Sequence, residues 1–195
     1  MIEDSQVEDA LSILTKKELE TYISLKNSIR KVNVSKDSEF QRKYNRFFGV
    51  RQRNEKFYDK YYKYMQRNKN NKKLTFEKVL RYISDKKTKR KMVEASFASK
   101  MLAIIDVKKP VLDKFVVKNL KDYENIDIKT ASPSDFEKRI QRKVTAYKKI
   151  CNWYDNLLEP ARKKKWIELF DKSFPEFKNK ITDVKKIDLI LWKIR

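Results

Sequence analysis

A single glycine, Gly49, stands in this chain of 195 residues. Glycine adopts positive φ at the least cost, so the sequence offers almost no place for the tight turns of β-hairpins. Turn pairs such as Asn-Gly are absent, and no segment alternates apolar and polar residues with a period of two. The lone glycine also excludes a G-x-x-x-x-G-K phosphate loop and a G-x-G-x-x-G nucleotide-binding turn. These features favour helices throughout the chain.

Apolar residues recur with a helical period along most of the sequence. The periodic segments are 15–32, 38–48, 53–68, 75–84, 89–105, 113–120, 130–158, 161–174 and 183–194. We therefore predict an all-α fold, a compact single-domain bundle over residues 1–195 with about eight to ten helices. A polar stretch near residues 68–74 marks a candidate boundary between two helical subdomains, with a cleft between them.

Polar residues indicate where several helices begin. Thr15 opens a capping box, Thr75 is placed to cap the helix after the polar stretch, and Ser5 is placed to cap a short first helix. In the segment that begins at residue 130, Ser132 occupies the cap position and Asp135 the third helical position. These residues predict the first turns of four helices.

The positive charge is the strongest functional signal. The chain has 49 Lys and Arg against 27 Asp and Glu, a formal net charge of +22 and a pI of about 9.9. A surface this cationic repels itself and fits a polyanionic partner. A Lys-rich proteome of low GC content would raise the number of lysines, but it would raise Asp and Glu as well. We therefore expect a nucleic-acid partner, with double-stranded DNA favoured.

The residue types that are missing exclude most enzyme chemistry. The chain has no histidine, so a histidine general base, a Ser-His-Asp triad and a histidine metal site are excluded. One cysteine, Cys151, cannot build a zinc finger or an intrachain disulfide. We expect no metal and no cofactor, so any catalysis must use carboxylates, lysines, hydroxyls or tyrosines.

The sequence gives no sign of a membrane or of secretion. No apolar run approaches the roughly 20 residues of a membrane span, and the N-terminal segment lacks the basic start and apolar middle of a signal peptide. The lone Cys151 agrees with a reducing compartment. We expect a monomeric protein of the cytoplasm that does not contact membranes.

The segment KKPVLDKFVVKNL, residues 108–120, brings a single aspartate to the start of a short basic helix. Small residues lie in the helix before it, an apolar pair comes directly before the aspartate, and a basic residue follows it. These residues are Ala98 and Ala103, Val111-Leu112, Asp113 and Lys118. In this pattern, residues 94–120 resemble the central part of the helix-hairpin-helix superfamily of DNA glycosylases.

The resemblance implies that Asp113 is the catalytic carboxylate of a DNA glycosylase. The family's hairpin carries a Gly-x-Gly whose amides bind a DNA phosphate, and this chain has the basic cluster Lys86, Lys87, Lys89, Arg90 and Lys91 there instead. Bifunctional members carry a lysine nucleophile at the position that is Glu94-Ala95 here. The resemblance therefore implies a monofunctional enzyme that removes a damaged or modified base and leaves an abasic site. Such an enzyme would act in repair, or in defence against phage DNA with altered bases.

The position of Asp113 suits this chemistry without the resemblance. Breaking an N-glycosidic bond passes through a positively charged, oxocarbenium-like sugar, which a nearby carboxylate stabilises. The helix dipole and the amides of the first turn keep an N-terminal aspartate ionised. The same placement is also typical of a plain helix cap, so the two interpretations stay open side by side.

Aromatic and cationic residues are interleaved around Gly49, as expected where an extruded base and its phosphates are held. The stacking candidates are Phe48, Tyr58 and Tyr62. The candidate phosphate ligands, besides the cluster at residues 86–91, are Arg46, Arg51, Arg53, Lys114 and Lys118. Aromatic residues at helical spacing fit a packed core equally well, whereas three arginines around one glycine have no obvious packing role.

Other interpretations remain open. The charge alone fits a basic helical protein without enzymatic activity that binds DNA or RNA as a regulator or accessory factor. Two D-x-K triplets, at residues 106–108 and 183–185, match the end of a nuclease site, but that site needs paired strands. The two C-terminal helices, 161–174 and 183–194, are expected to cover the core and to carry a basic outer face.

Overall fold

The computed structural model describes residues 1–84, 92–128, 134–157 and 160–194. In this part of the chain every regular element is helical and no strand is present, so the predicted all-α single-domain fold is confirmed. The α-helices are α1 (Asp4–Ser12), α2 (Lys16–Ser28), α3 (Ser38–Phe48), α4 (Glu55–Asn68), α5 (Phe76–Ile83), α6 (Ala95–Ile105), α7 (Lys114–Asp122), α8 (Phe136–Asn152), α9 (Pro160–Ser173) and α10 (Asp183–Lys193). A π-helical turn (Trp153–Leu157) continues α8, and a 3-10 turn (Pro175–Phe177) follows α9.

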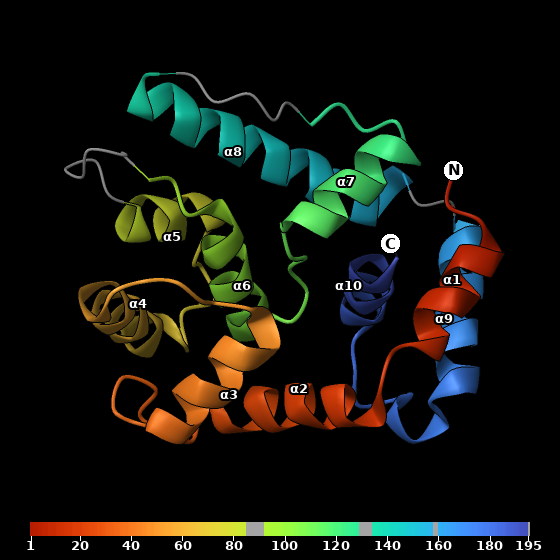
Figure 1. Cartoon of the computed structure of the whole chain (residues 1–195), viewed down its shortest axis with the longest axis horizontal. Helices are drawn as coiled ribbons and strands as arrows, with labels where there is room; N and C mark the ends of the chain where they lie inside the picture. The colour runs from red at the N-terminus through yellow and green to blue at the C-terminus, as the bar shows by residue number, and fades with distance from the viewer. Residues whose placement is uncertain (85–91, 129–133, 158–159, 195) are drawn as a thin grey trace.

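Helix α6 lies at the centre of the molecule, between α2, α5 and the segment that leads to α7 (Figure 1). All of its residues except Ser96 are buried. A helix that is buried on all sides belongs to the interior of a domain, and α6 accordingly runs through one continuous core that extends from Ile2 to Ile194. The helix begins at Ala95, later than the predicted start at residue 89. Met92, Val93 and Glu94 are not helical, and Glu94 is held instead by Ser84, whose hydroxyl oxygen accepts a hydrogen bond from the Glu94 amide at 3.1 Å.

Both ends of the described chain pack into the same layer. Helix α1 lies against α9 and α10, and α10 also contacts α7 (Figure 1). Glu124, just after α7, joins these segments, because its carboxylate accepts hydrogen bonds from the Ile2 amide (2.9 Å) and the Arg162 guanidinium (2.8 Å). The boundary predicted near residues 68–74 falls on the loop between α4 and α5 and stays a prediction.

Hydrogen bonds and backbone geometry confirm several predicted helix ends. Thr15 forms the predicted capping box at α2, and Thr75 accepts a hydrogen bond from the Lys78 amide at the start of α5. Gly49 ends α3 in the left-handed conformation, with φ of 62°, as expected for the one residue that adopts it without strain.

Two predictions about the first residues of helices are wrong. Helix α1 begins at Asp4 with Glu3 as its cap, because Glu3 and Gln6 form a reciprocal capping box before Ser5 is reached. Asp135 is the cap of α8 and not its third residue, since its carboxylate accepts a hydrogen bond from the Lys138 amide at 2.8 Å. The predicted cap Ser132 lies outside the described residues.

The predicted basic outer face of α10 is wrong for two of its lysines. Lys185 and Lys186 are each only 2% exposed. Their ammonium groups pair with the carboxylates of Asp188 (2.7 Å) and Asp171 (2.5 Å), respectively. The reason is that α1, α7 and α9 all pack on α10, so little of its circumference faces solvent.

None of the described helices has the length and apolarity that crossing a bilayer requires.

Candidate functional site

Each residue of the loop 110–112, which leads to Asp113, forms a hydrogen bond with a side chain of another helix. The Tyr147 hydroxyl donates to the Pro110 carbonyl at 3.1 Å, and the Val111 amide donates to the Asp188 carboxylate at 3.1 Å. The Leu112 amide donates to the Ser99 hydroxyl oxygen at 2.9 Å. These contacts come from α8, α10 and α6, so three helices fix the position from which α7 starts.

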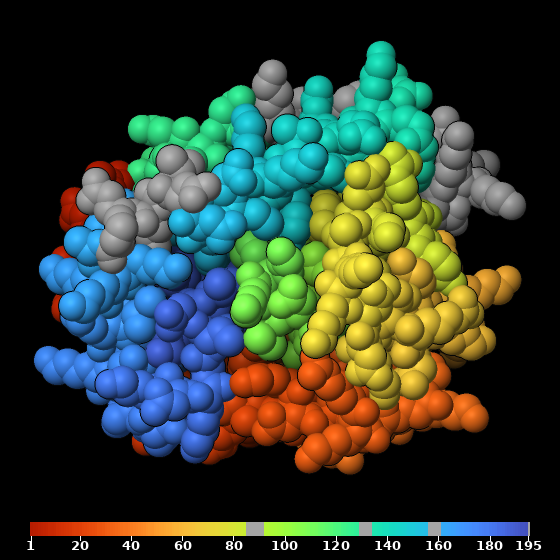
Figure 2. Space-filling model, turned by 180° about the vertical axis from the view of Figure 1, so that it is seen from behind, coloured from red at the N-terminus to blue at the C-terminus, as the bar shows by residue number. Residues whose placement is uncertain are grey.

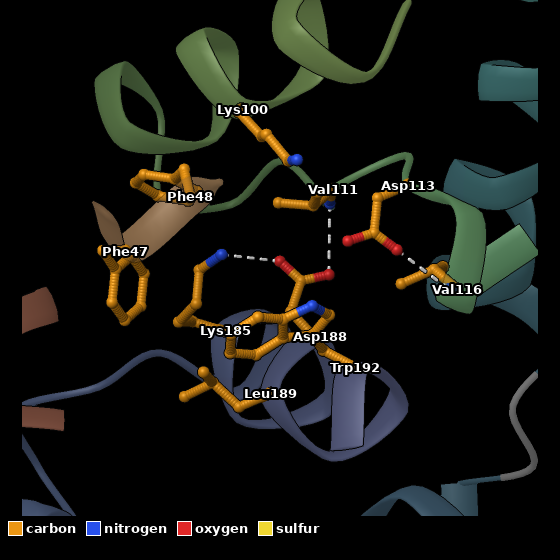
Figure 3. A pocket seen from close by; sticks show the side chains of 10 residues that line it. All are labelled: Phe47, Phe48, Lys100, Val111, Asp113, Val116, Lys185, Asp188, Leu189 and Trp192. Atoms are coloured by element: carbon orange, nitrogen blue, oxygen red, sulfur yellow. Dashed lines mark hydrogen bonds and ion pairs between the residues drawn. The ribbon is translucent and has the colours of Figure 1, made fainter. Parts of the chain in front are cut away.

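Asp113 is the N-cap of α7, as the sequence indicated. One of its oxygens, Oδ1, accepts hydrogen bonds from the amides of Phe115 (2.9 Å) and Val116 (3.1 Å). The residue is 9% exposed. Figure 3 shows the other carboxylate oxygen pointing away from the helix and into a pocket. The cap uses one oxygen of the carboxylate and leaves the second available.

The Asp113 pocket is small and has mostly apolar walls, with a cavity volume of about 40 Å³. Figure 3 shows its walls converging from α3, α6, the start of α7, and α10. The apolar side chains are Phe47, Phe48, Val111, Val116, Leu189 and Trp192. Two carboxylates, of Asp113 and Asp188, and two ammonium groups, of Lys100 and Lys185, also line it. Of the predicted site residues, Asp113 and Phe48 meet here.

Lys100 reaches the pocket from the buried face of α6, and the sequence reasoning missed it. Its ammonium group points into the pocket (Figure 3) and lies 5.8 Å from the centre of the Phe97 ring. Burial lowers the pKa of Lys100, while the negative charge of Asp113 opposes this shift. The signal in the sequence was a single lysine in a helix that is otherwise uncharged, because a charge in a buried helix needs a partner or a function.

Asp188 and Lys185 form the floor of the pocket and were also missed. Asp188 accepts hydrogen bonds from the Val111 amide, the Tyr154 hydroxyl (2.7 Å) and the Lys185 ammonium group (2.7 Å). Burial raises the pKa of Asp188, and Lys185 partly opposes the rise. The ammonium group of Lys185 also lies over the ring of Phe48, at 5.6 Å. This cluster holds the wall of the pocket and the backbone that precedes Asp113.

A second, larger cavity of about 530 Å³ opens along α7, on the other side of Asp113. We call it the α7 cavity, and its cationic side chains besides Arg53 are Lys114, Lys118, Lys121 and Lys143. Burial, together with the neighbouring charges of Arg139 and Arg142, lowers the pKa of Lys143. Among the described residues, Asp113 is the one that lines both this cavity and the Asp113 pocket.

The three arginines around Gly49 have different environments. Arg46 and Arg51 are exposed. Arg53 lines the α7 cavity, but its guanidinium binds the Glu94 carboxylate through two hydrogen bonds of 2.9 Å each. It also lies over the Phe97 ring at 4.9 Å. Glu94 therefore neutralises much of the charge that Arg53 would present to a phosphate.

The aromatic stacking candidates are divided between core and site. Tyr62 is 1% exposed, and its hydroxyl donates to the Asn45 side chain at 2.7 Å, so its ring is packed in the interior. Tyr58 is half-buried and donates to the Val50 carbonyl at 3.1 Å. Phe48 alone among the three lines the Asp113 pocket. The basic cluster Lys86, Lys87, Lys89, Arg90 and Lys91 lies outside the described residues.

We also looked for a metal site and for related proteins. Among the described residues, no group of three or more Asp, Glu or Cys side chains could hold a metal ion. No protein-family model, curated protein or solved structure matches the chain. Interpretation of the site therefore depends on its own geometry.

Proposed function

We propose that the protein is a DNA glycosylase that hydrolyses the N-glycosidic bond of a damaged or modified base and leaves an abasic site. The observation that carries the proposal is the position of Asp113, which alone among the described residues lines both an apolar pocket and a cavity that contains several lysines. A glycosylase needs this combination, because it binds phosphates outside the pocket and one base inside it. The net charge of +22 fits a double-stranded DNA substrate.

In this proposal the lysines of the α7 cavity bind the phosphates that flank the target nucleotide. The nucleotide turns out of the duplex, and its base enters the Asp113 pocket against the ring of Phe48. The pocket as it stands has room for only a few water molecules. Entry of a base therefore requires side chains of the wall to move aside, and the half-buried Phe47 and Trp192 are the candidates for this movement.

The reaction uses the free oxygen of Asp113. When the bond between C1′ and the base breaks, the electron pair leaves with the base and positive charge develops on the sugar. The carboxylate stabilises this charge, and the amides of the first turn of α7 hold it in place. Water then adds to C1′ and loses its proton to the departing base, so the products are a free base and an abasic site.

We place this activity in a monomeric protein of the cytoplasm. Its role would be DNA repair, or defence against phage with modified DNA.

The test is the substitution Asp113→Asn. Asparagine caps helices as well as aspartate does, so the variant is expected to fold. We expect it to lose abasic-site formation, measured as alkali-labile breaks and as released bases by mass spectrometry on a panel of modified DNAs. Its affinity for DNA is expected to hold or rise, because a negative charge has been removed.

The matched control is Asp135→Asn, which makes the same change at the exposed cap of α8. This variant should retain full activity. A wild-type protein that releases no base from any DNA in the panel, or an Asp113→Asn variant as active as wild type, would refute the glycosylase proposal.

A second function is favoured by the small volume of the Asp113 pocket, about 40 Å³. If the pocket does not open, Asp113 is a structural cap and the lysines of the α7 cavity serve DNA or RNA binding alone. The protein would then be a basic helical regulator or accessory factor. Tight, salt-sensitive DNA binding by a wild-type protein that forms no abasic sites would establish this alternative.

A further inference from the structure

A third cavity lies away from Asp113 and has a volume of about 700 Å³. We call it the α2 cavity. Its walls are the end of α2, the loop after α4, and the end of α6 with the turn that follows it. Figure 2 shows this green turn lying between the orange segment at α2 and the yellow segment after α4. The cavity is therefore built from three segments that are far apart in the sequence.

Positively charged side chains line this cavity, with almost no negative charge beside them. The cations that line it are Lys26, Arg30, Lys31, Lys69, Lys72 and Lys108. Its single carboxylate, of Asp106, accepts a hydrogen bond from the Lys108 amide at 3.0 Å. None of the six cations forms an ion pair with a carboxylate of the described chain, although many other lysines do. A cavity with this charge attracts anions.

Two of these ammonium groups are fixed by the backbone and are not neutralised. Lys69 is 8% exposed, and its Nζ donates to the Val32 carbonyl at 2.6 Å and to the Arg30 carbonyl at 3.5 Å. Lys26 donates to the Lys180 carbonyl at 2.9 Å. Carbonyl oxygens orient a cation but leave its full charge in place. The fold therefore holds cations at this cavity before any ligand arrives.

The side chains that line the α2 cavity indicate the chemical groups of its ligand. None of the described residues that line the cavity is aromatic, so these walls offer a base no ring on which to stack. The uncharged polar groups are the amides of Asn27, Asn70 and Asn71, which bind phosphate and sugar oxygens. The remaining walls are aliphatic. This combination suits a row of phosphates that is bound without regard to base identity.

We propose that the α2 cavity binds the phosphodiester backbone of a second segment of nucleic acid, apart from the segment at Asp113. The α2 cavity and the α7 cavity share no lining residue, and they lie at opposite ends of α6. Phe97 lines the α7 cavity and Ile105 the α2 cavity, which places them about 12 Å apart along the helix axis. The protein thereby holds two duplex segments at once, and this property stands whether or not Asp113 is catalytic.

The test is a capture assay with two duplexes, one attached to a bead and one carrying a fluorophore. The wild-type protein is expected to bring the free duplex to the bead. In the variant Lys31→Glu/Lys72→Glu, which changes two exposed side chains of the cavity, we expect capture to fall about tenfold or more. Binding to a single short duplex should change much less, because the α7 cavity is untouched.

The matched control is Lys172→Glu/Lys178→Glu, which makes the same change of charge at exposed positions outside the cavity. It should capture the second duplex as the wild type does. Equal loss of capture in both double variants, or unchanged capture in Lys31→Glu/Lys72→Glu, would overturn the proposal, since charge at this place would then have no special role.

A free oligophosphate is the competing ligand, and sodium tripolyphosphate is the probe for it. Calorimetric binding of tripolyphosphate that the cavity variant loses, together with unchanged capture of DNA, would assign the cavity to a small anion and overturn the proposal. The variant Asp113→Asn separates the two proposals of function. It should capture the second duplex normally even though it forms no abasic sites.

Discussion

At the scale of single residues, the buried pair of Lys185 and Asp188 gives a prediction about stability. Removal of one partner leaves a buried charge without compensation, which typically costs about 3 kcal/mol or more. We expect Lys185→Met to lower the free energy of unfolding by this amount in urea titrations followed by circular dichroism. The double variant Lys185→Met/Asp188→Asn should be more stable than the single one, because the second charge is then also gone.

The exposed residue Lys172 provides the control for this pair. Lys172→Met should change the free energy of unfolding by less than about 0.5 kcal/mol, as is usual at the surface. If Lys185→Met were as stable as wild type, or if the double variant were less stable than the single one, the buried pair would not have the role described.

The cap at Asp113 could be predicted from the sequence, and this buried pair could not. A cap depends only on the few residues that follow it. The burial of Lys185 and Asp188 depends on partners that are distant in the sequence, such as the Val111 amide that donates to Asp188. A helical period indicates which residues share a face of a helix, but not how many of its faces are covered.

At the scale of elements, helix existence was predictable and helix contacts were not. The bounds of α3 agree with the predicted segment 38–48, since a capping residue and Gly49 mark its ends. The late start of α6 was missed because the apolar period continues through Met92 and Val93, which are not helical. No local pattern indicates that α1 packs on α9, so the role of Glu124 as the link between Ile2 and Arg162 appears only in the structure.

The link at Glu124 predicts how acid destabilises this layer. Burial raises the pKa of Glu124, but hydrogen bonds from Arg162 and Ile2 outweigh it, so the pKa is lowered from 4.5. A carboxyl whose pKa is lower in the folded protein stabilises the fold above the unfolded value, and this stability is lost as the pH falls through the folded value. We expect the melting temperature of Glu124→Gln to fall less than that of wild type between about pH 6 and pH 3.

The substitution Glu20→Gln, at an exposed position, serves as the control and should show the same pH dependence as wild type. At neutral pH, Glu124→Gln should be the less stable protein, because Arg162 has lost its carboxylate. Parallel melting curves of Glu124→Gln and wild type across this pH range would contradict the prediction.

At the scale of the whole molecule, the fold class followed from the sequence and the two cavities did not. One glycine, a helical period and no alternating segment are sufficient for an all-α fold. The net charge of +22 predicted cationic surfaces but not their places. Where lysines converge depends on how α2, α6 and α7 are arranged, and the apolar period carries no information on this arrangement.

This distribution of charge predicts a steep dependence of DNA binding on salt. With about six to ten phosphate contacts, the affinity for duplex DNA should fall roughly a thousandfold or more between about 50 and 200 mM salt, as followed by fluorescence anisotropy. The variant Lys114→Gln/Lys118→Gln removes two cations from the α7 cavity and should reduce the slope of log K against log salt by about two. A shallow slope in the wild type would contradict phosphate contacts as the main source of affinity.

The two oxygens of the Asp113 carboxylate make different contacts, and the proposed reaction gives this difference an evolutionary consequence. One oxygen closes the first turn of α7 and the other faces the pocket. Asparagine can make the same cap but carries no charge. If Asp113 is catalytic as we propose, a lineage loses the reaction in one mutational step and keeps the folded protein. Among related chains, the residue at this position would then distinguish enzymes from inactive proteins.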